Sequence, residues 1–96
     1  MFKVEVGNST LTFMAYSRII QEIDGISVEN DKNSFYAILY DFGMPVGCGR
    51  LKIEENLYII DNIRIYKDSF SNDLVEDIKK QLLRKANTIG IKEKKQ

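Results

Sequence analysis

The chain has 96 residues, 44% of them hydrophobic, and its 14 basic side chains balance 14 acidic ones. That composition suits one globular domain spanning residues 1–96, and a net charge of zero excludes bulk attraction to nucleic acid or to a membrane surface. The sequence has no histidine and a single cysteine, Cys48, which excludes Ser-His and Cys-His catalytic couples and an internal disulfide, so no metal site is expected either.

The N-terminal part of the chain predicts a strand followed by a helix. Apolar and polar residues alternate over Phe2–Val6, which is typical of a strand with one buried face. Ser9 or Thr10 can cap a helix that runs to about Ile23. In an alternative interpretation, the alternation continues to Phe13 and this whole segment forms a hairpin. We favour the helix because its apolar residues repeat at helical spacing: Phe13, Tyr16, Ile19, Ile20 and Ile23.

The middle of the chain predicts a three-stranded meander. Residues 24–33 are polar and predict a loop. Segments rich in β-branched and aromatic residues then predict three antiparallel strands: Ser34–Phe42, Val46–Ile53 and Leu57–Tyr66. Turns are expected at residues 41–45, where Gly43 takes a positive φ angle, and at residues 54–56.

The last predicted element is an amphipathic helix over Asp73–Thr88, which follows a short polar loop. Asp73, with a glutamate three residues later, predicts a capping box at the start of this helix, and Gly90 predicts its end. The charged tail, residues 92–96, is expected to fray. One face of the helix is predicted to be buried and another to face water: Leu74, Ile78 and Leu82 against Lys79, Lys80 and Arg84.

Together these elements predict an α/β domain of the α+β type. Their order is β-α-β-β-β-α, and the helices pack on a mostly antiparallel sheet. No apolar run approaches the roughly 20 residues of a membrane span. The first ten residues lack the apolar core of a signal peptide. We therefore expect a cytoplasmic protein that contacts neither membrane nor nucleic acid.

One long stretch of the sequence resembles a known family. A turn with an acidic residue and a glycine leads into Pro45-Val46-Gly47-Cys48-Gly49-Arg50-Leu51, then into an isoleucine-rich strand, a loop and a long helix. This series of motifs resembles the GCN5-related N-acetyltransferase (GNAT) superfamily over most of the chain. The resemblance implies a GNAT-like fold whose C-terminal part, which in the family follows the long helix, has no counterpart after Gly90. It also implies acyl-CoA-dependent acetyl transfer to an unspecified small-molecule or peptide amine.

The same resemblance implies roles for residues of the last strand and helix. The backbones of Ile63 and Ile65 would hold the pantetheine arm and the thioester carbonyl of acetyl-CoA. Asp61 would be a general base that deprotonates the amine. The start of the helix would bind the pyrophosphate, since backbone N–H groups at a helix N-terminus attract anions. The residues at this start are Ser71, Asn72, Asp73, Leu74 and Val75.

The sequence departs from the family at this pyrophosphate motif, which reads Gln/Arg-x-x-Gly-x-Gly/Ala. Phe70, Asp73 and Val75 stand at the positions of the basic or amide residue and the two small residues. The family's tyrosine general acid and the strand that forms the pantetheine slot have no counterpart after Gly90. Four carboxylates crowd the place of the phosphates and would repel them: Asp68, Asp73, Glu76 and Asp77. We therefore expect weak or absent acetyl-CoA binding, and a non-catalytic protein-interaction module is the alternative function.

Two of the residues singled out also have purely structural interpretations. Asp61 is the only acidic residue of its strand, and a carboxylate that faces an edge or a turn, where it could pair with Arg50 or Arg64, is favoured over a catalytic role. Cys48 lies between two glycines and has no base to activate it, so we interpret it as a small buried hydrophobic residue.

The predicted strand Leu57–Tyr66 also predicts self-association. The neighbour that this strand has in the family has no counterpart here, so its backbone groups would be unpaired and open to another chain. Asp61 and Arg64 could then fix the register of a homodimer. In the alternative, residues 91–96 fold back over the strand. The apolar residues are predicted on two faces, with Ile59, Ile63 and Ile65 on one and Tyr58, Ile60 and Tyr66 on the other.

Overall fold

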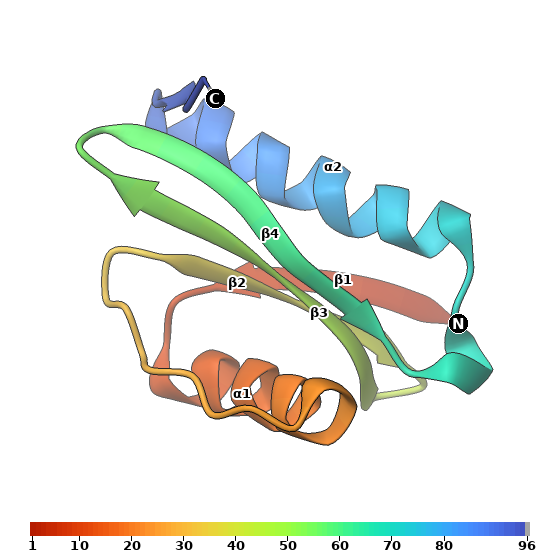
Figure 1. Ribbon diagram of the computed structural model, residues 1–96. Helices are drawn as coiled ribbons and strands as arrows, with labels where there is room; N and C mark the ends of the chain where they lie inside the picture. Colours follow the sequence, from red (N-terminus) through yellow and green to blue (C-terminus); the bar gives the residue numbers. More distant parts are fainter. Residues whose placement is uncertain (96) are drawn as a thin grey trace.

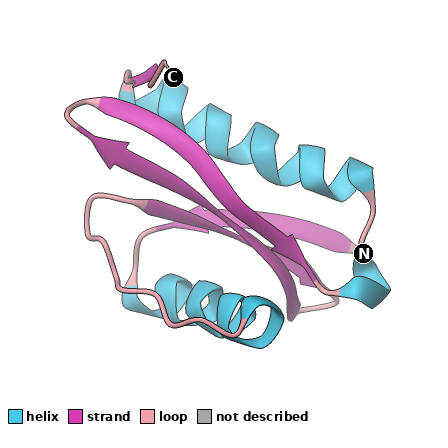
Figure 2. Cartoon of the chain, viewed as in Figure 1, coloured by secondary structure: helices cyan, strands magenta, loops and turns pink. Residues whose placement is uncertain are grey.

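The structure, a computed structural model, describes residues 1–95 and consists of a five-stranded sheet with one helix on each face (Figure 1). The sheet order is β1-β2-β3-β4-β5, in which the first three pairings are antiparallel and the last is parallel (Figure 2). This arrangement confirms the predicted α+β class. The elements are β1 (Phe2–Gly7), α1 (Thr10–Asp24), β2 (Phe35–Asp41), β3 (Met44–Glu54), β4 (Leu57–Ile65), the 3-10 helix η1 (Lys67–Ser69), α2 (Asn72–Ile89) and β5 (Lys92–Glu93).

The first helix forms because its start and end are both satisfied locally. Ser9 is the N-cap residue, and its hydroxyl accepts a hydrogen bond from the backbone N–H of Thr12 at 3.1 Å. Gly25 ends the helix in the left-handed conformation, with φ of 71°. The predicted helix is therefore confirmed, and the alternative hairpin is wrong, because β1 pairs with β2 rather than with the segment after it.

Both connections of the meander are two-residue turns. Phe42 and Gly43 join β2 to β3, and Glu55 and Asn56 join β3 to β4. All four residues have positive φ angles, as type I′ hairpin turns require. The predicted positive φ of Gly43 is confirmed at 82°. The turns are shorter than predicted, and β3 extends into both of them beyond the predicted Val46–Ile53.

Each face of the sheet has its own hydrophobic core. The core between the sheet and α1 contains the buried Tyr16, Ile19, Ile20, Tyr36, Ile38 and Cys48. The core between the sheet and α2 contains Ala37, Leu39, Leu51, Tyr58, Ile65, Leu74, Ile78, Leu82 and Ala86. The predicted inner face of α2 is confirmed, since Ile78 and Leu82 are fully buried while Lys79, Lys80 and Arg84 are exposed.

The start of α2 differs from the predicted capping box. Ser71, not Asp73, is the N-cap residue, and its hydroxyl accepts a hydrogen bond from the backbone N–H of Leu74 at 3.2 Å. Ser71 has the extended backbone of an N-cap, whereas Asp73 already lies in the first helical turn. The Asp73 carboxylate therefore acts only through its charge near the helix N-terminus. Gly90 ends the helix with φ of 87°, as predicted.

A β-bulge interrupts β4 and was not predicted. Asp61 lies opposite Arg50, and Arg64 lies opposite Cys48, so Asn62 and Ile63 together lie opposite the single residue between Arg50 and Cys48. Asn62 has φ of 53°, a left-handed conformation that asparagine tolerates better than most residues. Because the bulge adds one residue, it shifts the alternation of side chains along the strand.

This shift corrects the predicted faces of β4. Ile63 and Ile65 share the α2 side of the sheet with Tyr58 and Ile60, and not with Ile59 as predicted. Beyond the bulge, Tyr66 lies on the α1 side.

The C-terminal residues pair with β4 instead of fraying, which corrects the expectation for the charged tail. Lys92 and Glu93 form β5, parallel to Leu57 and Tyr58, and the backbone N–H of Lys94 donates to the Tyr58 carbonyl at 2.9 Å. The predicted unpaired edge is therefore shorter than Leu57–Tyr66, because β5 covers its first two residues. Neither helix of residues 1–95 has the length and hydropathy needed to cross a bilayer.

Candidate functional site

The edge of β4 beyond β5 is the first part of the candidate site. The Tyr58 carbonyl accepts its hydrogen bond from β5, whereas the Tyr66 backbone N–H donates to Val46 on the β3 side at 2.9 Å. Backbone groups of successive residues in a ladder alternate in direction, and the bulge resets this alternation. It follows that the backbones of Ile60, Ile63 and Ile65 point away from β3, toward the side where residues 1–95 provide no further strand. The Ile63 carbonyl already accepts a hydrogen bond from Arg64 Nη1 at 2.9 Å.

The start of α2 is the second part of the candidate site. The backbone N–H groups of Leu74 and Val75 are already used, since they donate to the Ser71 hydroxyl and carbonyl, both at 3.2 Å. The N–H groups of Asn72 and Asp73 belong to the first helical residues, which have no partner within a helix. Two backbone donors thus face outward at the helix end that attracts anions.

Negative side chains oppose that attraction. Asp68, Asp73, Glu76 and Asp77 are all exposed around the first turns of α2. Their charges stabilise the helix through its dipole, but they repel a phosphate placed at the same end.

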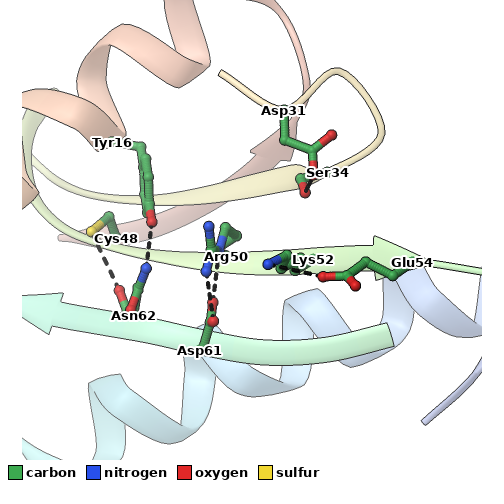
Figure 3. Close-up of polar contacts among 9 residues, drawn as sticks. All are labelled: Tyr16, Asp31, Ser34, Cys48, Arg50, Lys52, Glu54, Asp61 and Asn62. Carbon is green, nitrogen blue, oxygen red and sulfur yellow. Dashed lines mark hydrogen bonds and ion pairs between the residues drawn. The ribbon is translucent and has the colours of Figure 1, made fainter. Parts of the chain in front are cut away.

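The Asp61 side chain lies on the α1 side of the sheet and forms an ion pair. The Arg50 guanidinium donates from Nε to Oδ1 at 2.8 Å and from Nη2 to Oδ2 at 2.7 Å (Figure 3). These hydrogen bonds raise the pKa of Arg50 well above its usual range. The predicted ion pair is confirmed, and both carboxylate oxygens of Asp61 already bind a permanent cation. Accepting a proton would break this pair, so the geometry opposes the role of a general base.

The bulge is held in place by polar contacts on the α1 side. Asn62 Nδ2 donates to the Tyr16 hydroxyl at 2.8 Å, and Cys48 Sγ donates to the Asn62 carbonyl at 3.7 Å (Figure 3). Burial raises the pKa of the Cys48 thiol to about 12, so the thiol is protonated and inert at neutral pH. The predicted structural role of Cys48 is confirmed. The role of Asn62 was missed, although an asparagine within an isoleucine-rich strand is a signal for a left-handed residue.

The two other polar residues at the end of β4 also have partners within the chain. Arg64 Nε donates to both oxygens of Asp24, at 3.0 and 3.1 Å. The Tyr66 hydroxyl donates to Glu22, and burial followed by this contact raises the pKa of Tyr66 to about 12. Because Asp61 and Arg64 are both paired internally, they give no basis for the predicted register of a homodimer.

A groove of about 950 Å³ lies between β4, α2 and β5. We call it the β4–α2 groove. Its apolar lining comes from Tyr58, Ile59, Ile60 and Leu83, and its charged rim consists of Glu76, Lys79, Lys80, Glu93, Lys94 and Lys95. Among residues 1–95, no three Cys, Asp or Glu side chains lie close enough together to hold a metal ion.

The structure thus separates the predicted site residues into two groups. Ile63 and Ile65 on the open edge of β4 lead along the chain into the start of α2 at Ser71–Val75. The Asp61 side chain lies on the opposite, α1, side of the sheet, with Arg50 and Tyr16. The arrangement provides backbone donors and acceptors for an extended ligand, and it provides no free side-chain base among the predicted residues.

Proteins of known structure share this fold and little of the sequence. An acyl-CoA N-acyltransferase from Pseudomonas aeruginosa is 12% identical with a TM-score of 0.71, and the match covers 94% of this chain and 73% of that protein. A GCN5-related N-acetyltransferase from Kribbella flavida is 13% identical with a TM-score of 0.72, covering 96% and 38%. N-acetylglutamate synthase from Neisseria gonorrhoeae, complexed with coenzyme A and N-acetyl-glutamate, is 19% identical with a TM-score of 0.62, covering 93% and 24%. No family model and no curated protein sequence matches the chain.

The chain therefore has the fold of the GNAT-type N-acetyltransferases, as the resemblance of its motifs implied. It spans between 24% and 73% of the length of these three proteins. At identities below 20% the likeness establishes the fold, and the activity has to be argued from the residues of the site.

Proposed function

We propose that this chain is an acyl-CoA-dependent N-acetyltransferase of the GNAT type that binds acetyl-CoA weakly and transfers the acetyl group to an amine. The observation that carries the proposal is the open backbone edge at Ile63 and Ile65, which leads into the N-terminus of α2. The likeness to an acyl-CoA N-acyltransferase and to a protein crystallised with coenzyme A supports acyl-CoA as the ligand.

In this proposal the cofactor is held mainly by backbone groups. The amides of the pantetheine arm pair with the outward N–H groups of Ile63 and Ile65 and with the Ile65 carbonyl, as an added strand would. The Ile63 carbonyl already accepts a hydrogen bond from Arg64 Nη1 at 2.9 Å. The N–H groups of Asn72 and Asp73 face the pyrophosphate. An acceptor amine attacks the thioester carbonyl, the carbon–sulfur bond breaks, and the proton lost by the amine goes to the thiolate of coenzyme A.

The affinity is expected to be low because the charges at the helix start act against the phosphates. Asp73 and Val75 also occupy the positions at which the resemblance implies small residues, so backbone approach is hindered as well. Each of these effects lowers binding without removing the edge of β4.

A titration followed by two-dimensional ¹⁵N–¹H NMR tests the proposal directly. Millimolar acetyl-CoA is expected to shift the backbone amide signals of Ile63, Ile65, Asn72 and Asp73 progressively. The amides of β1, on the far edge of the sheet, serve as the internal control and are expected to stay unchanged. Absence of shifts at β4 and α2, with the protein folded, would refute acyl-CoA binding.

The ion pair between Arg50 and Asp61 favours a second candidate function. Since Asp61 is not a free base and the start of α2 is acidic, the fold can also serve as a non-catalytic protein-interaction module. In that case acetyl-CoA is expected to cause no shifts of the backbone amide NMR signals, and the open edge of β4 binds polypeptide instead.

A further inference from the structure

The β4–α2 groove joins the open edge of β4 to a row of exposed lysines. Its floor includes Ile60 and Leu83, the second of which is 42% exposed. Groove and edge are continuous, since Ile60 lines the groove and its backbone also points outward. Beside Ile60, a ligand on this edge therefore meets outward backbone groups, apolar surface and positive charge together.

We propose that the edge of β4 and the β4–α2 groove bind an extended, acidic segment of a partner protein, which adds to the sheet as a strand. Its acidic side chains face α2, where Lys79 and Lys80 lie, and its apolar side chains lie on the opposite side beside Ile59. This inference rests on the second candidate function, because the added strand and acetyl-CoA would compete for the same backbone groups of Ile63 and Ile65.

The backbone geometry supports strand addition. β5 already pairs with the first two residues of β4, which shows that this edge accepts a strand, and it ends there. The next outward-pointing backbones belong to Ile60, Ile63 and Ile65. Natural edge strands usually carry lysine or proline that blocks pairing, whereas β4 has neither, and its Asp61 and Arg64 are turned to partners on the α1 side.

The charge of the groove selects an acidic partner. Four lysines and two glutamates line its rim, and one of these glutamates, Glu76, pairs with Lys79 at 3.4 Å. The excess of positive charge is local, because the whole chain has no net charge. Opposite charges across an interface increase both the rate of association and its specificity.

The same charges argue against a second copy of this chain as the occupant. Pairing two copies of β4 about a two-fold axis would bring the two basic rims together, and like charges across an interface are destabilising. The ion pairs of Asp61 and Arg64 also leave no charged pair to offset that repulsion.

Fluorescence anisotropy with synthetic peptides tests the proposal. The probe is a fluorescein-labelled ten-residue peptide of alternating Glu and Val, and the matched peptide has Lys in place of Glu. The Glu peptide is expected to bind at least about tenfold more tightly than the Lys peptide. The double variant Lys79→Glu/Lys80→Glu is expected to lose at least about tenfold in affinity, while Lys32→Glu/Lys67→Glu, with the same change in net charge at exposed sites outside the groove, is expected to keep it.

Hydrogen exchange then distinguishes an added strand from loose charge attraction. Bound Glu peptide is expected to slow exchange of the outward amides of Ile60, Ile63 and Ile65. Ile60→Pro removes one such donor without removing a hydrogen bond to β3 and is expected to weaken binding. Three results would each overturn the proposal: equal affinity of the parent protein for the two peptides, equal affinity of Lys79→Glu/Lys80→Glu and the parent for the Glu peptide, or unchanged hydrogen exchange at β4. A stable dimer by sedimentation that excludes the peptide would also overturn it, in favour of a second copy.

Discussion

Arg50 and Asp61 lie directly opposite each other on β3 and β4 and form a bidentate ion pair. The Nε–Oδ1 distance is 2.8 Å and the Nη2–Oδ2 distance is 2.7 Å. The side chains are 20% and 33% exposed, so the pair is partly shielded from water. It lies next to the bulge at Asn62 and joins β3 to β4 on the side of the sheet that α1 covers. The pair therefore assigns Asp61 a structural role.

Replacing Asp61 by Asn is expected to lower the free energy of unfolding by about 1–2 kcal/mol, because Arg50 is left without its anionic partner. Urea denaturation measures this loss. The matched control is Asp24→Asn, whose partner Arg64 is 39% exposed, and a smaller loss is expected there. A double-mutant cycle with Arg50→Gln is expected to show coupling, and purely additive effects would contradict the structural role.

Ser71→Ala is expected to destabilise the protein by about 1 kcal/mol, since it removes the acceptor for the Leu74 N–H. Asp73→Ala is expected to cost less, about 0.3–1 kcal/mol, because its carboxylate acts only through the helix dipole. Thermal or urea denaturation of both variants compares them. A larger loss for Asp73→Ala than for Ser71→Ala would restore Asp73 as the cap.

Leu82→Ala is expected to cost about 2–5 kcal/mol, because the side chain is fully buried between α2 and the sheet. The neighbouring Leu83 provides a matched control, since it is 42% exposed and the same substitution there removes less buried surface. Urea denaturation of both variants measures the difference. Similar losses at the two positions would mean that the inner face of α2 is wrongly identified.

The protein is expected to lose stability as the pH rises above about 9, in part through Cys48. Burial raises the pKa of this thiol to about 12, so the unfolded chain releases the proton first and gains stability relative to the folded chain. Between pH 8.5 and 10 the free energy of unfolding is expected to fall by about 1 kcal/mol for this reason. Urea denaturation at several pH values is expected to show a smaller decrease for Cys48→Ala. The same slope in the variant and the parent would show that the thiol titrates normally.

The sequence predicts the parts of this fold that depend on local pattern. Helical spacing identified the buried face of α2 at Ile78 and Leu82, Gly43 marked a position of positive φ, and Gly90 marked the end of α2. Asn62 could not be placed in the same way, because its left-handed conformation depends on the register with β3 and on the hydrogen bond to Tyr16, 46 residues earlier. The strand at Lys92–Glu93 was missed because its residues are charged and form a strand only through pairing with β4.

In the candidate site, too, features that depend on local pattern were predicted and features that depend on tertiary pairing were not. The resemblance implied a site at Ile63, Ile65 and the start of α2, and these residues lie along the edge of β4 and the helix end that follows it. The sequence offered two arginines near Asp61, Arg50 and Arg64, and the structure shows that Arg50 is the partner. Which side of the sheet Asp61 takes depends on the bulge, so this was decided by tertiary pairing and could not be deduced from alternation alone.

In the proposed function, acetyl-CoA binds at the β4 edge and the acidic start of α2 makes this binding weak. Isothermal titration calorimetry of acetyl-CoA against the parent chain, Asp73→Asn and Asp73→Gly/Val75→Gly tests it most directly. We expect a dissociation constant weaker than about 100 μM for the parent, tighter binding when the charge is removed, and binding at least about tenfold tighter for the double glycine variant. A micromolar dissociation constant for the parent, or no binding by any of the three proteins, would contradict the claim.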